Sequence, residues 1–136
     1  MADMATATQF DIGELLREVI VSDAKMASKV GSRVYPGELP DTTSYSSNSS
    51  DLPAIHYSLV DDVESDEAPI SRSDWQFTVV AGTQSELQST CGALKALLNR
   101  YKHDRIRYVE YVNSSTDWDP EVKTPYSPMT FKVTFY

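Results

Sequence analysis

The chain has 136 residues, of which 40% are hydrophobic and 24% charged, and its formal net charge at pH 7 is −8. This size suits one globular domain with a single core, and no apolar run approaches the roughly 20 residues of a transmembrane helix. The negative charge opposes the attraction to phosphates on which non-specific nucleic-acid binding depends. Cys91 has no second cysteine to pair with, and residues 1–8 lack the basic and apolar parts of a secretory signal. We therefore expect a protein made in a cytoplasm.

The first predicted element is an N-terminal helix that begins near Asp11. Its apolar residues recur at helical spacing and form one stripe: Ile12, Leu15, Leu16, Val19 and Ile20. Residues 22–25 either continue this helix or start another turn. Gly31 is suited to end the helical part in a left-handed conformation, and residues 33–35 are typical of a short strand.

A polar segment rich in Ser, Thr, Asn and Asp follows and forms the first of two expected long loops, at about residues 37–53. A connection of this length is usually functional or mobile. Beyond it, residues 54–60 and about 73–79 alternate apolar and polar side chains, which predicts two half-buried strands in an antiparallel hairpin. The connection between these strands is acidic and contains Asp61, Asp62 and Glu64.

The clearest pattern is the passage from the second of these strands into a helix over 83–101. Thr83 lies three residues before Glu86, the spacing of a capping box, and an apolar stripe then follows at helical intervals: Leu87, Cys91, Leu94, Leu98 and Tyr101. A strand with one apolar face and a helix with one apolar stripe must bury these surfaces together. The sequence therefore predicts an α+β fold of two layers, in which this helix and the N-terminal helix pack on a mostly antiparallel sheet.

Two further strands are expected at 105–112 and 129–135, separated by a second long polar loop at about 113–127. Trp118 and Tyr126 are large aromatic residues within that loop. Trp118 either packs back onto its own domain or is an anchor for a partner, because tryptophan is enriched at interface hot spots.

The chain shows none of the motifs that carry catalysis or ligand binding. Its glycines have no spacing that cradles a phosphate, and no serine lies in a nucleophile-elbow motif. His56 and His103 have no second His or Cys at metal-ligand spacing, and the acidic segment lacks the central glycine of a calcium loop. We therefore predict no catalytic residues, no cofactor and no metal.

A cluster of cations surrounds the end of the long helix and includes Arg105 and Arg107. Cations at this position can simply complement the helix dipole. Alternatively, they contact the acidic hairpin of a neighbouring copy, because a head-to-tail ring requires two different and complementary surfaces. Asp61, Asp62 and Glu64 would then form the other half of that contact.

Taken in order, these segments resemble the tail completion (tail terminator, or head–tail joining) family of long-tailed bacteriophages. The resemblance rests on the following pieces: Gly31-Ser-Arg-Val-Tyr-Pro36 after the N-terminal helix, Leu52-Pro-Ala-Ile-His-Tyr-Ser-Leu-Val60, Trp75-Gln-Phe-Thr-Val-Val-Ala81, the helix at 83–101, and the terminal strand from Pro128 to Tyr136. Together they cover most of the chain, which the resemblance treats as one domain over residues 1–136.

The resemblance implies a non-enzymatic subunit that forms a ring, typically a hexamer, at the head-proximal end of a tail tube. There it would stop tube growth and offer a docking face for the neck. Its partners would be copies of itself, the tail tube protein and a neck or head–tail connector protein. DNA would pass through the lumen without specific binding, and no membrane would be involved. The protein would belong to the virion and would assemble in the cytoplasm of a bacterial host.

Three alternatives remain open from the sequence. A head-completion or stopper protein of the neck belongs to the same class. A small ligand-binding or enzymatic α+β domain would need an enclosed pocket with converging polar groups. A single-strand nucleic-acid binder would use Tyr57, Trp75 and Phe77 as stacking platforms, but the acidic composition opposes that function.

Overall fold

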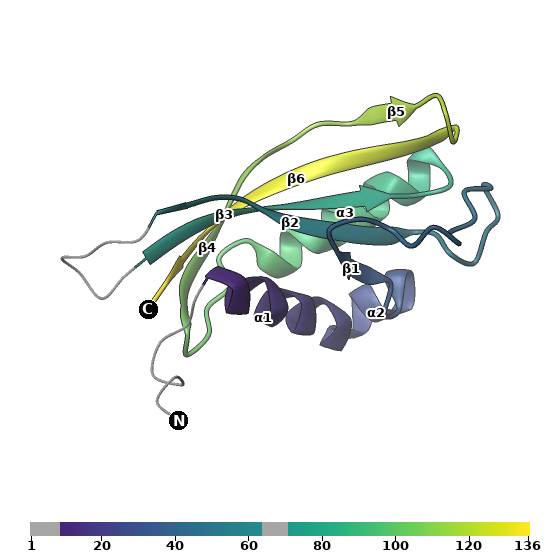
Figure 1. Ribbon diagram of the computed structural model, residues 1–136. Helices are drawn as coiled ribbons and strands as arrows, with labels where there is room; N and C mark the ends of the chain where they lie inside the picture. Colours follow the sequence, from purple (N-terminus) through teal and green to yellow (C-terminus); the bar gives the residue numbers. More distant parts are fainter. Residues whose placement is uncertain (1–8, 64–70) are drawn as a thin grey trace.

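The computed structural model describes residues 9–63 and 71–136 and shows three helices and six strands in that part of the chain (Figure 1). The elements in chain order are α1 (Gln9–Ser22), α2 (Ala24–Val30), β1 (Val34–Pro36), β2 (Ala54–Val63), β3 (Ser71–Val80), α3 (Gln84–Leu98), β4 (Ile106–Ser114), β5 (Asp117–Asp119) and β6 (Thr124–Phe135). The strands form one sheet in the order β1-β2-β3-β6-β4, and β5 pairs with β6 beyond the end of β4. Among the described strands, β1 and β2 pair in parallel and the other neighbours pair antiparallel. The predicted α+β fold is confirmed.

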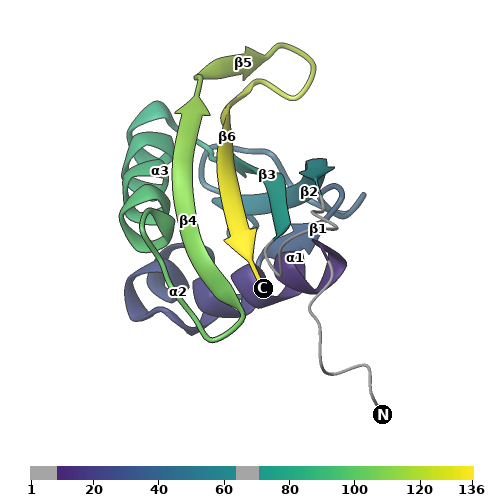
Figure 2. The same ribbon diagram turned by 90° about the vertical axis from the view of Figure 1, so that its left-hand side faces the viewer.

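The helices α1, α2 and α3 lie on the same face of the sheet (Figures 1 and 2). In the described part of the chain, no helix covers the other face. The molecule therefore has a helical layer and a sheet layer, and one sheet face remains available for contacts that the helices do not make.

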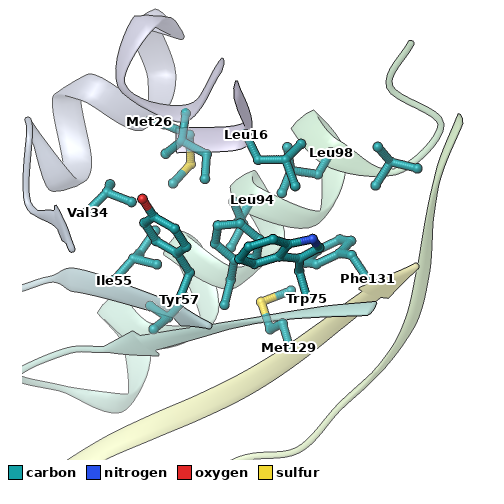
Figure 3. Packing of buried hydrophobic residues seen from close by; sticks show 14 of the residues in the cluster. Leu16, Met26, Val34, Ile55, Tyr57, Trp75, Leu94, Leu98, Met129 and Phe131 are labelled. Atoms are coloured by element: carbon teal, nitrogen blue, oxygen red, sulfur yellow. The ribbon is translucent and has the colours of Figure 1, made fainter. Parts of the chain in front are cut away.

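The core lies between these two layers. Alternate residues of the central strands point toward the helices, so Phe77 of β3 and Phe131 of β6 are fully buried and their rings meet edge to face at 6.1 Å. Leu94 and Leu98 of α3 are also fully buried, and Figure 3 shows them facing Trp75 and Phe131. Each such side chain contributes about 1.5–3 kcal/mol through burial.

The N-terminal helical region contains two helices, which decides the alternative left open at residues 22–25. Asp23 has extended backbone angles, and its carboxylate accepts a hydrogen bond from the amide of Met26 at 3.0 Å. This side chain caps α2 as a new helix. Gly31 ends α2 with a positive φ of 58°, as expected, but its ψ of −126° lies outside the left-handed helical region.

The capping box of the long helix forms with one change. Thr83 Oγ1 accepts from the amide of Glu86 at 3.2 Å, while the carboxylate of Glu86 reaches back to the amide of Gly82, one residue before the usual partner. The helix ends at Leu98, three residues earlier than predicted. Asn99 is extended and Arg100 has a φ of 71°, which is incompatible with continued helix.

The chain after α3 folds back along the outer edge of β4. The amide of Arg100 donates to the carbonyl of Val109 at 2.7 Å, and the amide of Val109 donates to the carbonyl of Tyr101 at 3.2 Å. Asn99 Oδ1 accepts from the amide of Tyr111 at 3.1 Å. These bonds satisfy backbone groups that an edge strand would otherwise expose to another chain.

The first expected loop, 37–53, packs against the helix-free face of the sheet and forms a second small core there. Leu39 and Leu52 are buried together with Ala54 and Val80, and the rings of Tyr35, Tyr45 and Tyr126 cover them. A few apolar residues within a polar segment therefore fix its position, which the polar composition alone did not indicate.

The second expected loop, 113–127, differs more from its prediction. β4 continues to Ser114, β5 follows almost directly, and β6 already begins at Thr124. Proline usually argues against a paired strand because it lacks a backbone donor. Here Pro125 and Pro128 still accept hydrogen bonds through their carbonyls, from the amides of Ala81 at 3.3 Å and Ser115 at 3.4 Å.

Candidate functional site

A groove of about 430 Å³ lies on the helix-free face of the sheet. It is lined by Glu38 and Tyr45 from the loop 37–53, by His56 from β2, and by Asp119 and Tyr126 from the β5–β6 hairpin. The groove exists because the loop and the hairpin both pack onto the same sheet face. Alternation along β6 places Thr124 and Tyr126 on that face, while Met129 and Phe131 beyond them belong to the main core.

The groove is electrostatically negative at neutral pH. Its described lining includes the carboxylates of Glu38 and Asp119 but neither lysine nor arginine. Burial lowers the pKa of His56 below its usual value, and the smaller opposing effects of the Gly37 backbone and Glu38 do not reverse this. His56 is therefore neutral at pH 7.

Both tyrosines of the groove have a raised pKa, to which nearby carboxylates contribute. Burial raises the pKa of Tyr45, and the charges of Asp119, Asp41 and Glu38 add to the increase. The charge of Asp117 is the main cause that raises the pKa of Tyr126. Two phenol rings with neutral hydroxyls therefore lie beside carboxylates, an arrangement that attracts cations.

The predicted basic residues lie where the chain enters β4. Arg107 is exposed on β4, at an irregularity of the β4–β6 register between Ile106 and Tyr108. Arg105 is half-buried, and its carbonyl accepts from the amide of Tyr136 at 3.3 Å. Arg107 is therefore the more accessible of the two predicted cations.

Two of the predicted acidic residues, Asp61 and Asp62, lie within β2 and not in the connection after it, because the strand continues to Val63. Asp61 is exposed and lies opposite Asp74 of β3. Asp62 pairs through its backbone with Ser73, but its side chain and the whole of Glu64 lie outside the described residues.

The sheet register places Asp61 and Arg107 at the same end of the sheet. Val63 pairs with Arg72 at the end of β2, and the first residue of β4, Ile106, pairs with Phe135, which pairs with Ser71. The strands β3 and β6 separate the two sites. Asp61 and Arg107 therefore lie on opposite sides of one subunit.

Trp118 and Tyr126, expected in one loop, have different environments. Trp118 lies on β5 opposite Pro125 and keeps 55% of its surface exposed, so its ring is not packed into the core of its own subunit. Tyr126 is half-buried and belongs to the second core. Because residues alternate along a strand, Trp118 points to the opposite side of the hairpin from Asp117 and Asp119.

The groove itself was not predicted from the sequence. Its residues come from five separate segments, and their proximity depends on the docking of the loop 37–53. The isolated Leu39 and Tyr45 within a polar segment were the available signal, because apolar side chains in such a segment tend to find a buried contact.

The protein has a two-layer α+β fold with a mixed, mostly antiparallel sheet. The chain is similar in structure to a chain from the virion of a native gene transfer agent particle, with a TM-score of 0.67 and 12% sequence identity. The match covers 88% of this chain and 90% of that chain, and at this identity it shows a shared fold. No family model and no curated protein matches the sequence. None of the helices in the described part of the chain is long and apolar enough to span a bilayer.

Proposed function

We propose that this protein is a structural subunit of a phage or phage-like virion. More specifically, it forms a hexameric ring at the head-proximal end of a tail tube, ends tube polymerisation and joins the tail to the neck. The observation that carries the broader proposal, a structural subunit of a virion, is the fold likeness to a virion chain, which covers 88% of this chain and 90% of that chain. The order of sequence segments that resembles tail completion proteins supports the more specific function at the end of a tail tube.

The distribution of charge is compatible with a ring. A closed ring of identical subunits needs two different surfaces on opposite sides of each copy, and Asp61 and Arg107 occupy such positions at one end of the sheet. We propose that Arg107, with Arg105 beside it, contacts the Asp61 end of β2 in the next copy, where Asp62 and Glu64 add negative charge. The net charge of −8 suits a lumen through which DNA passes without binding.

The test of this function is assembly with a tail tube. We expect native mass measurement of the purified protein to show a closed oligomer, alone or after addition of tail tube protein, and we expect added protein to stop tube elongation. A pull-down that recovers tail tube protein supports a tail terminator, whereas one that recovers only portal-adaptor proteins supports a neck stopper. A protein that stays monomeric and binds neither would contradict the proposal.

Charge reversal tests the proposed contact between copies. We expect Arg107→Glu to raise the dissociation constant between neighbouring copies about tenfold. An exposed ion pair is worth about 0.2–1 kcal/mol, and charge reversal adds repulsion to that loss. The double variant Asp61→Arg/Arg107→Glu should recover association, since it restores opposite charges across the contact. Analytical ultracentrifugation measures both effects.

Lys25→Glu provides the matched control for this pair. Lys25 is exposed on α2, and its replacement changes the net charge by the same amount without touching the proposed contact. Association of Arg107→Glu at the level of the Lys25→Glu control would rule out this contact while leaving the tail function itself to the tube assay.

A further inference from the structure

We propose that the groove on the helix-free face binds an arginine side chain that an extended segment of a partner protein presents. The proposal is separate from the ring contact, because it concerns a different face of the subunit. It starts from charge: Glu38 and Asp119 line the groove, and no lysine or arginine among the described lining residues neutralises them. An occupant that brings a positive charge is therefore favoured over a neutral or anionic one.

The aromatic lining favours an organic cation. Tyr45 and Tyr126 both contribute to the groove, and the face of a tyrosine ring attracts a guanidinium or ammonium group within about 6 Å of its centre. A metal ion is not favoured, because no three His, Cys, Asp or Glu side chains in the described part of the chain come together with the geometry to hold one.

The buried hydroxyl of Thr124 favours arginine over lysine. Thr124 is 1% exposed, lines the groove, and its Oγ1 has no hydrogen-bond partner. A buried polar atom without a partner is costly, and a ligand donor would satisfy it once a small movement of the hairpin uncovered the atom, which is closed to solvent in the free protein. A guanidinium has five N–H donors in a planar fork and can bond a hydroxyl and a carboxylate together, whereas an ammonium group is a compact point charge.

The size of the groove favours a side chain attached to a segment of backbone. Its volume of about 430 Å³ lies within the range of sites that take drug-sized molecules. It is bordered by loop and hairpin residues on the outer surface of the sheet, so a chain in extended conformation can pass over it while one side chain enters.

Titration of the full-length, ¹⁵N-labelled protein with the peptide Ac-Gly-Arg-Gly-NH₂ tests the proposal by NMR. We expect shifts of the amides of Thr124, Tyr126 and Gln76 and a dissociation constant in the millimolar range, because one side chain carries the affinity. The citrulline peptide has nearly the same shape without the charge and should bind at least tenfold more weakly. The lysine peptide should bind several-fold more weakly.

Two variants connect the binding to the groove. Asp119→Asn should weaken arginine binding about fivefold, and it keeps the oxygen that accepts from the amide of Glu121 at 2.9 Å, so the hairpin turn is retained. Glu121→Gln is the matched control, since Glu121 is exposed on the same hairpin and does not line the groove; it should bind like the wild type. Thr124→Val should weaken binding while it raises the thermal midpoint, because it removes an unsatisfied hydroxyl.

Equal binding of the arginine and citrulline peptides would overturn the proposal. Equal binding of the arginine and lysine peptides would overturn the choice of a guanidinium. Shifts spread over the acidic surface, or an equal loss in Asp119→Asn and Glu121→Gln, would show attraction by net charge and would overturn the site.

Discussion

Replacement of Gly13 by alanine is expected to lower the free energy of unfolding by about 2 kcal/mol, whereas the same replacement at Gly92 is expected to raise it by about 0.5–1 kcal/mol. Both glycines lie inside helices, Gly13 in α1 and Gly92 in α3, so alanine brings the same gain in helix propensity at both positions. The difference comes from what the added methyl group meets.

At Gly13 the new Cβ would lie 2.5 Å from Cη2 and 2.6 Å from Cζ3 of Trp75. That indole is 5% exposed, and its Nε1 donates to the buried Ser73 hydroxyl at 2.9 Å. The ring cannot move without loss of this bond, so α1 must shift away from the sheet, and overpacking of this kind costs about 1–3 kcal/mol or more. At Gly92 no atom lies within 4 Å of the new Cβ apart from the adjacent residues and the backbone of the helix itself.

Urea unfolding followed by circular dichroism measures both changes. The Gly92→Ala variant is the internal control, because it has the same chemistry and the same helical context without the indole. Stabilisation by Gly13→Ala would show that α1 does not pack on Trp75 as closely as the structure indicates.

Local sequence patterns determined the elements whose contacts are close in the chain. The alternation of Trp75, Phe77 and Val79 leads directly into a helix whose cap and leucine stripe follow within a few turns, so each signal supports the next. All of these residues except the cap lie in the main core. Periodicity is reliable here because one face of each element is buried by its immediate neighbour in sequence.

The parts that the sequence did not predict depend on contacts between distant segments. The strand β6 begins at Thr124 because residues 124–126 pair with β5, and Tyr126 also pairs with Val80 of β3. The local sequence, which contains two prolines, does not predict either pairing. Likewise, the loop 37–53 is fixed by the packing of Leu39 and Tyr45 near Val80. The groove requires both features, so local pattern alone could not reveal it.

Of the predicted interface residues, Trp118 is the one whose removal should have the largest effect on assembly. We expect Trp118→Ala to weaken association with its assembly partner, a neighbouring copy or the tail tube protein, about 30-fold or more. A tryptophan at the centre of an interface contributes about 2 kcal/mol or more. The Trp118 side chain is 55% exposed, so its indole contributes little to the stability of the isolated subunit. The free energy of unfolding should therefore change by less than about 0.5 kcal/mol.

The two measurements together separate an anchor from a structural residue. Assembly is followed by native mass measurement and by the tube-capping assay, and stability is followed by urea unfolding of the same preparations. Trp118→Phe should retain most of the association, since it keeps a large aromatic surface. If Trp118→Ala assembles like the wild type, the exposed indole is not an anchor. If Trp118→Ala instead unfolds at much lower urea concentration, the indole stabilises the β5–β6 hairpin of its own subunit. The surface that contacts the partner would then be the groove face or the region of Arg107.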